Sequence, residues 1–542
     1  MNRAPGRAWR RAGAVALLAL TASPRALARD GPSEDELFGG TSPAPAESPN
    51  TGPAAEKPAS DDGSARSPAD AGTPVAPAAD DREAQILGGG GTPMPLQEAA
   101  PSDPLQIGGQ LYLRSQSTAL EGQPPRNWSF NTPFLLDVYF DARPNERVRA
   151  YALGRMSFDS TLPSGTIGSG STAVGGTAGS PSLDALFRPQ SGSPRVTLDQ
   201  LWLRFDIAHR VFVTAGKLHA RWGTGRFWAP TDYLHVRRRN PLDVFDARSG
   251  TTMLKLHVPI EAKAWNFYGY AITEGTEATS TVDRVAAAAR AEFVFGSAEL
   301  GLGALFQRHR APKLGADLSM GIGDFDVYGE FALRDGGEID RVQFAPNAVV
   351  PPFGEPPSWE TPAQTAVREL EQVVDTYYPV HRSNGIKEQV VGGFSYSHKY
   401  NDSDTFTLGG EYFYNGLGHR TTWSYPGLML PHSFELADAV TFYYLGKHYA
   451  AIFLALPAPY SLDAHSFTLT TLGNLSDRSF ITRLDYSFLM LTHLRLEAFA
   501  SARYGNESGE FRLGVSTVGL GGYNFSRAPA IADFGAALRL SI

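Results

Sequence analysis

The sequence predicts an all-β fold, a transmembrane up-and-down antiparallel β-barrel of about 18 strands preceded by a disordered linker. Three observations support this: alternation of apolar and polar residues, regularly placed turns, and the lack of any apolar stretch of the roughly 20 residues that a transmembrane helix needs. Residues 296–334 show the alternation most clearly. Leu318 and Phe331 fall on one face of the predicted strands, and Asp317 and Glu330 fall on the other.

Eighteen segments carry this pattern, and most have the roughly 9–11 residues of a tilted membrane-crossing strand. We predict strands at 106–116, 128–142, 147–158, 195–207, 210–219, 250–258, 263–273, 284–296, 297–309, 312–321, 324–334, 388–399, 404–414, 446–456, 464–474, 478–489, 492–503 and 532–542. An even number of strands suits a barrel in which both ends of the chain lie on the same side of the membrane.

The connections between these strands alternate in length. Those after even-numbered strands are short and rich in turn residues, at 143–146, 208–209, 259–261, 295–297, 321–323, 400–403, 457–463 and 490–491. Those after odd-numbered strands are often long, at 159–194, 220–249, 335–387, 415–445 and 504–531. Short periplasmic turns and long external loops are typical of outer-membrane barrels.

The first 28 residues have the features of a secretory signal peptide. Basic residues between Arg3 and Arg11 precede a short apolar core at 12–22, and Ala26-Leu27-Ala28 forms a small-x-small cleavage site. We therefore expect residues 1–28 to be removed and the mature chain to begin at Arg29.

Residues 29–104 are predicted to form a disordered periplasmic linker. The segment is rich in Pro, Ala and acidic residues, and such a composition buries too little apolar surface to offset the entropy of ordering. Two apolar islands, 37–40 and 86–89, are either docking motifs for a periplasmic protein or incidental residues of a tether. The barrel is expected to occupy 105–542.

The polar faces of the predicted strands carry charges of both signs. A charge facing lipid at the bilayer midplane costs about 2–4 kcal/mol, so these side chains are expected to face a wet lumen. The predicted pore-lining residues on the wall are Lys255, Arg284, Arg290, Glu292, Glu330, Arg483, Asp485, Arg495 and Glu497. Each could form an ion pair within the wall or contact a passing solute, and the first alternative is the more common.

The long connection at 220–249 concentrates positive charge. Its six arginines are Arg221, Arg226, Arg237, Arg238, Arg239 and Arg248. If this loop folds into the barrel, it forms a constriction that favours anions. If it lies outside, the arginines contact acidic lipid headgroups or nearby aspartates, and Trp222 and Trp228 would anchor the strand end at the headgroup level.

A family resemblance rests on this loop. The run Gly216-Lys217, then Trp222-Gly223-Thr224-Gly225 and Pro230-Thr231-Asp232, resembles a segment of large porin-like and alginate-export-like outer-membrane barrels of Gram-negative bacteria. There, Gly-Arg-Gln-x-x-x-Trp-Gly is followed by Asn-Pro-x-Asp. Residues 446–449 and 474–479 are similar to other parts of those families. Lys217 replaces the usual Arg, and Ile542 replaces the usual terminal aromatic residue. The resemblance implies a channel or an export conduit.

One helix is predicted within the connection 335–387. Thr361 is a candidate N-cap, Pro362 suits the first helical position, and Gln364 completes a capping box. The helix, at 361–377, would lie either inside the lumen as a plug or over the barrel mouth.

Composition excludes several classes of function. Cysteine is absent, which removes disulfides and thiolate metal sites, and the net charge of −8 does not indicate a nucleic-acid partner. No catalytic motif or metal-ligand spacing is present, so we expect no enzyme activity, no cofactor and no metal. The leading hypothesis is a porin-like channel in the cell outer membrane, in contact with lipid, for passive passage of small hydrophilic solutes, anions included. The alternatives are an export conduit or scaffold that binds a periplasmic partner and, less favoured, a membrane enzyme with a dispersed Ser/His site.

Overall fold

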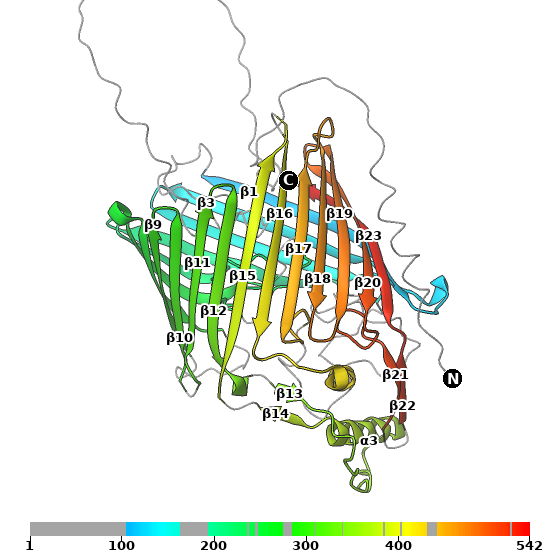
Figure 1. The fold of residues 1–542 in the computed structure, drawn as a ribbon. Coiled ribbons are helices and arrows are strands. Elements are labelled where there is room, and N and C mark those ends of the chain that lie inside the picture. Colours follow the sequence, from blue (N-terminus) through cyan, green and yellow to red (C-terminus); the bar gives the residue numbers. More distant parts are fainter. Residues whose placement is uncertain are drawn as a thin grey trace, which may run out of the picture.

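The structure is a computed structural model, and it describes residues 104–162, 193–235, 238–243, 248–274, 285–308, 310–338, 340–382, 385–401, 404–430, 442–520 and 523–542. Its main feature is one antiparallel sheet that closes on itself (Figure 1). The sheet contains 19 strands, of which the short β2 (Ser129–Asn131) only pairs with β1, leaving 18 strands in the wall. The fold class predicted from the sequence is confirmed.

Each predicted segment corresponds to a wall strand, with ends that differ by a few residues. The wall strands are β1 (Leu105–Leu120), β3 (Pro133–Asn145), β4 (Val148–Asp159), β5 (Arg195–Ile207), β6 (Val211–Leu218), β7 (Thr251–Ile260), β8 (Trp265–Ile272), β9 (Ala286–Phe295), β10 (Ala298–Phe306), β11 (Lys313–Ile322), β12 (Phe325–Asp335), β15 (Ile386–Lys399), β16 (Thr405–Asn415), β17 (His448–Pro457), β18 (His465–Asn474), β19 (Ser479–Leu491), β20 (Leu494–Gly505) and β23 (Ala530–Ser541).

The barrel is closed by the first and last of these strands. β1 pairs with β23 in antiparallel register from Gln110↔Ser541 to Thr118↔Asp533, and the N–H of Ile542 donates to the carbonyl of Gly109. Closure satisfies the backbone groups that a sheet edge would leave open, which a lipid environment requires.

The two ends of the barrel differ. Tight turns join strands at one end, the upper end in Figure 1, and Gly296 and Gly323 supply the positive φ that two such turns need. At the other end lie the longer connections, where the described residues include small two-stranded antiparallel sheets, β13 (Asp340–Val342) with β14 (Val380–Arg382) and β21 (Val515–Leu520) with β22 (Tyr523–Arg527). We call these the turn end and the loop end.

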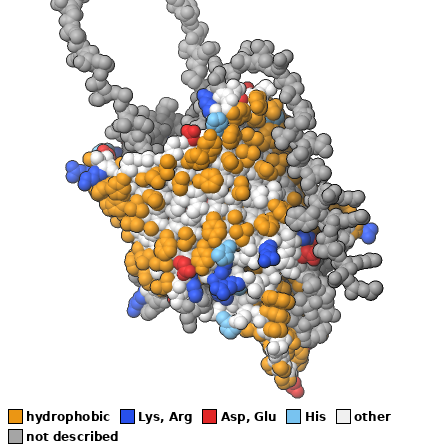
Figure 2. Space-filling view, viewed as in Figure 1, with side chains coloured by type: hydrophobic (Ala, Val, Ile, Leu, Met, Phe, Trp, Pro, Cys, Tyr) orange, Lys and Arg blue, Asp and Glu red, His pale blue; other side chains and the backbone are white. Residues whose placement is uncertain are grey.

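On strands such as β7, alternating residues separate an apolar exterior from a charged interior. Leu254 and Leu256 of β7 are each 41% exposed, whereas Lys255 and His257 between them are buried. Figure 2 shows the exterior of one side as a surface dominated by hydrophobic side chains. This distribution suits a barrel that has lipid outside and water inside.

The predicted helix is α3 (Pro362–Tyr377). It lies beyond the ends of the wall strands, at the loop end of the barrel (Figure 1). Thr361 and Gln364 form the expected capping box. Val373 and Val374 are fully buried in a cluster that includes Tyr378 and the short helix α4 (Tyr425–Met429). Among the described residues, 3-10 turns lie at Pro125–Asn127, Glu261–Lys263, Gly336–Glu338 and Thr422–Ser424. No helix in the described part of the chain is long and apolar enough to cross a membrane.

Candidate functional site

The connection between β6 and β7, residues 219–250, contacts distant parts of the wall, and we call it the inward loop. Its described residues are 219–235, 238–243 and 248–250. The carboxylate of Glu411 in β16 accepts backbone N–H groups from Arg226 at 2.7 Å, Phe227 at 3.2 Å and Trp228 at 2.8 Å. In the wall, β8 to β12 and β15 separate β7 from β16, so the loop reaches well across the barrel.

A second wall carboxylate holds the same loop. Glu330 in β12 accepts the N–H of Gly225 at 2.5 Å and the Thr231 hydroxyl at 2.8 Å. A Cβ atom on Gly225 would lie 1.9 Å from the carbonyl oxygen of Trp228, and Gly223 has a φ of +94°. The two glycines of the Trp-Gly-x-Gly motif therefore let the backbone fold tightly against Glu330.

The two tryptophans of the loop are the largest buried side chains in the described chain. Trp228 stacks on Phe413 with ring centroids 5.6 Å apart, and its indole N–H donates to the carbonyl of Tyr443 at 3.0 Å. Trp222 packs edge-on against Tyr270. The expectation that Trp222 and Trp228 anchor a strand end at the lipid headgroups is wrong, because both rings are shielded by the loop and the inner wall.

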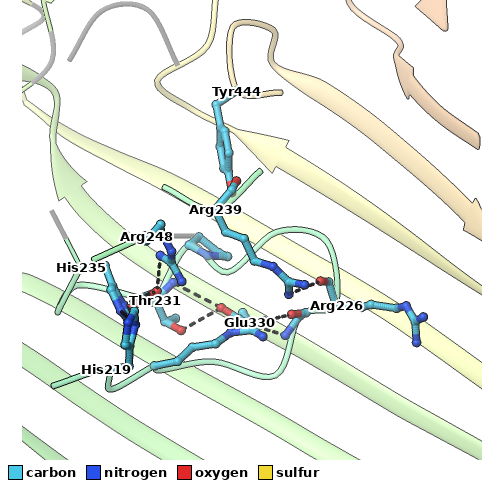
Figure 3. A network of polar contacts seen from close by, with 12 residues as sticks. His219, Arg226, Thr231, His235, Arg239, Arg248, Glu330 and Tyr444 are labelled. Atoms are coloured by element: carbon cyan, nitrogen blue, oxygen red, sulfur yellow. Dashed lines mark hydrogen bonds and ion pairs between the residues drawn. The ribbon is translucent and has the colours of Figure 1, made fainter. Parts of the chain in front are cut away.

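Five arginines and one carboxylate line a small cavity between the inward loop and the loop end. The cavity encloses about 20 Å³ and is lined by Arg221, Phe227, Ala229, Asp232, Arg238, Arg239, Arg248, Arg334 and Tyr444. Figure 3 shows Arg239 and Arg248 approaching it from two sides, with Tyr444 above. This space holds roughly one water molecule.

Several of these arginines contact neutral groups. Arg239 donates to the carbonyl of Arg226 at 3.3 Å, Arg334 donates to the carbonyl of Pro230 at 2.9 Å, and Arg238 lies over the ring of Tyr444. Arg248 forms an ion pair with Asp232 at 3.0 Å. The lining of the cavity thus contains five guanidinium groups and one carboxylate.

Asp232 also belongs to a chain of polar contacts that fixes the start of the loop. His235 contacts Asp232 through Nδ1 at 3.2 Å and His219 through Nε2 at 3.4 Å, and His219 in turn contacts Asp199 of β5 at 3.3 Å. Burial would raise the pKa of Asp232, but His235 and Arg248 outweigh it and hold that pKa well below its usual value. Burial and Arg248 lower the pKa of His235.

The remaining predicted wall residues lie in separate groups. Arg290 bridges Asp317 at 2.6 Å and Glu292 at 2.7 Å, and Lys255 lies over the ring of Tyr268. Further around the barrel, Arg483 pairs with Asp485 at 2.6 Å and donates to the carbonyl of Leu242 in the inward loop.

Glu497 pairs with Arg539, and Arg495 lies opposite Arg539 in the strand register. The loop residue Arg226 stacks on Phe453, and Arg221 donates to the carbonyl of Gly225. Arg237 and Arg284 lie outside the described residues.

Several residues of the site were not among the predicted ones. Glu411, Arg334, Asp199, the ion pair Arg155–Asp137 and the buried ion pair Arg503–Asp533 also belong to the charged interior. The alternation that marked the other charges marks these too. Their partners come from distant segments, and no local pattern reveals such pairing. In the described residues no group of His, Cys, Asp and Glu side chains is arranged to hold a metal ion.

Comparison with known proteins gives similarity in fold only. No protein-family model and no curated protein sequence matches the chain. Among solved structures, OccAB1 of Acinetobacter baumannii has a TM-score of 0.45 and 10% identity over 81% of this chain and 96% of its own. OccAB4 of the same organism has a TM-score of 0.43 and 7% identity over 82% of this chain and 100% of its own. A triple mutant of the Rhodopseudomonas blastica porin has a TM-score of 0.35 and 10% identity over 81% of this chain and 100% of its own.

Proposed function

We propose that the protein is a channel of the cell outer membrane through which small hydrophilic solutes diffuse, with a preference for anions. The first support for this proposal is the barrel itself. A wall of 16–18 strands encloses an aqueous channel unless a plug fills it, and here α3 lies beyond the strand ends. The apolar exterior supplies the contact with membrane lipid.

The inward loop is the observation that carries the preference for anions. Glu330 and Glu411 hold its backbone through N–H groups, so their negative charges are engaged by the loop backbone. Five of the nine residues that line the cavity are arginines, and a cluster of arginines at a constriction favours anionic solutes.

Planar-bilayer recording of the purified protein tests this function. We expect stepwise conductance and, in a salt gradient, a reversal potential whose sign shows that anions permeate better than cations. Bilayers that stay silent with folded protein would contradict the channel, and a cation-selective reversal potential would contradict the role of the arginines.

A second proposal concerns residues 29–104, which lie outside the described residues. Their acidic, Pro-rich composition suits a periplasmic tether that docks a partner protein, as an export conduit or scaffold would need. Deleting 29–104 should abolish partner capture from periplasmic extract while the barrel keeps its heat-modifiable migration. Capture that persists without the segment would exclude this role.

A further inference from the structure

A group of cations lies at the outer rim of the barrel, at the loop end of β15, β16 and β17. It consists of Arg341, Lys387, Arg420 and Lys447, and we call it the rim patch. Figure 2 shows basic and histidine side chains gathered on this side, near the lower border of the hydrophobic surface. The inward loop and the channel proposal use none of them.

Backbone contacts bring these four residues together. A bridge between His419 and Gly446 places Arg420 beside Lys447. The guanidinium of Arg341 donates to the carbonyl of Gly418 at 2.8 Å, which holds it near the same bridge. The N–H of Gly416 donates to the carbonyl of Glu388 at 2.9 Å, which places Lys387 at the edge of the group.

The patch has an excess of positive charge. Glu388 is the carboxylate that acts on Lys447, and its side chain accepts a hydrogen bond from the Tyr414 hydroxyl at 3.1 Å. Lys387, Arg420 and Lys447 form no ion pair with any residue that the structure describes.

The cations of the rim patch repel one another. Burial, Arg420 and Arg341 together lower the pKa of Lys447, and burial with Arg420 lowers the pKa of Arg341. Burial and Arg341 lower the pKa of His419 to about 4, so this neighbour adds no charge at neutral pH. A bound anion would relieve this repulsion.

The surface next to the patch is suited to lipid. Ile386, Val390 and Ile452 are 70%, 37% and 61% exposed on the outer faces of the same strands. Tyr412 of β16 and His448 of β17 lie on neighbouring strands of the same surface, joined by a hydrogen bond of 2.7 Å between the hydroxyl and Nδ1. Tyrosines in this position mark the membrane–water interface. The cations therefore lie where the headgroups of surrounding lipids begin.

We propose that the rim patch binds the phosphate group of a phosphorylated glycolipid in the leaflet that faces the loop end. Arginine and lysine bind phosphate through charge-assisted hydrogen bonds, and basic clusters beside a membrane-spanning segment bind anionic headgroups. This inference rests on the proposed placement in the outer membrane, but it does not depend on conduction.

The test uses the full barrel purified in an uncharged detergent. The probe is a bis-phosphorylated, acylated glucosamine disaccharide, compared with its dephosphorylated form, and native mass spectrometry measures the lipid that stays bound. The test variant is Arg420→Gln with Lys447→Gln. Its matched control is Lys263→Gln with Lys399→Gln, which removes two exposed cations from the turn end.

Each cation next to an anionic headgroup strengthens binding roughly fivefold, so the test variant should bind the phosphorylated probe about tenfold or more weakly. The control and the wild type should bind it equally, and the dephosphorylated probe should bind all three weakly. Equal binding by the test variant and the wild type would overturn the proposal. Displacement of the lipid by equimolar inorganic phosphate would also overturn it, since the site would then be one for free anions.

Folding and channel activity are measured on the same samples. The test variant should retain heat-modifiable migration and the wild-type conductance, because Arg420 and Lys447 belong neither to the inward loop nor to the lining of its cavity. A silent wild type with intact lipid binding would contradict only the channel, and a conducting wild type without lipid binding would contradict only the rim patch.

Discussion

The carboxylate of Glu411, on the inner face of β16, accepts the backbone N–H of Trp228 from a loop that begins at β6, with a donor–acceptor distance of 2.8 Å. The neighbouring N–H groups of Arg226 and Phe227 point to the same carboxylate. One wall side chain thus fixes three consecutive residues of the inward loop and decides where the arginines lie.

Replacing Glu411 by Gln should loosen this attachment. The amide keeps one acceptor oxygen and presents an NH₂ group to backbone donors, so we expect a loss of about 1–3 kcal/mol in the free energy of unfolding. A looser loop should also give noisier single-channel currents. Denaturant unfolding and bilayer recording measure the two effects. The control Asp326→Asn changes an exposed carboxylate near the turn end, and it should alter neither the free energy of unfolding nor the current noise. If Glu411→Gln were as stable as the wild type and its currents no noisier, the loop would be held by packing alone.

Removing two arginines from the cavity should reduce the preference for anions. In the double variant Arg238→Gln and Arg239→Gln, we expect the anion-to-cation permeability ratio to fall roughly two- to fivefold, the effect of about 0.5–1 kcal/mol in a hydrated, screened site. Reversal potentials in a salt gradient report this ratio. Arg147→Gln, at the turn end, provides the comparison and should leave the ratio unchanged.

Trp228 should matter for stability because its ring is fully buried between the loop and the wall. Trp228→Ala removes the stacking on Phe413 and leaves a cavity, which typically costs about 3–5 kcal/mol. Trp359→Ala, at a side chain that is 73% exposed, should change stability by less than about 0.5 kcal/mol. Guanidinium unfolding of both variants in the same detergent checks the difference, and similar values for the two would contradict the packing described above.

The loop end should lose stability as the pH rises. Glu510, between β20 and β21, accepts hydrogen bonds from the Tyr449 hydroxyl at 2.6 Å and the Asn474 amide at 2.9 Å, and its backbone N–H donates to Asp477. Burial and the neighbouring Asp477 raise the pKa of Glu510 to about 8 from an ordinary value of 4.5.

The folded protein therefore holds a proton that the unfolded chain has released, so this group destabilises the fold progressively between about pH 4.5 and 8. We expect the melting temperature to fall as the pH is raised from about 6 to 9. Glu510→Gln cannot ionise and should flatten this dependence, whereas Glu507→Gln, an exposed carboxylate in the same loop, should preserve it. An unchanged slope in Glu510→Gln would assign the pH dependence to other groups.

Processing at the N-terminus can be checked directly. Mass spectrometry of the protein extracted from membranes should show a chain that begins at Arg29, because Ala26-Leu27-Ala28 matches the small-x-small cleavage pattern. Replacing Ala28 by a bulky residue such as Leu should slow cleavage and leave a longer form in the inner membrane. A mature protein that still begins at Met1 would exclude a cleaved signal peptide.

Alternation alone was sufficient to predict the wall of the barrel. Segment 195–207 was predicted as a strand and β5 spans Arg195–Ile207, because side chains on a strand face opposite sides whatever the rest of the chain does. The capping box at Thr361 and Gln364 was predictable for the same reason, since it joins residues three apart. The inner position of Lys255 and Arg290 followed from their place in the alternation of polar and apolar residues.

The direction of the arginine loop was not predictable. Arg221 and Arg226 suited a loop folded inward as well as one lying against lipid, and Trp222 and Trp228 suited headgroup anchors as well as buried rings. The choice depends on Glu330 and Glu411, which lie 105 and 183 residues along the chain from the Gly225 and Trp228 N–H groups that donate to them. Residue type and spacing in the sequence do not indicate hydrogen bonds between residues so far apart in the chain.

The amino-acid sequence by itself thus determined the barrel, its strand number and its apolar exterior, because these follow from a period of two that every strand repeats locally. Only the tertiary structure decided which charges meet, where the inward loop lies and how the rim patch assembles, because those contacts join segments that closure of the sheet alone brings side by side.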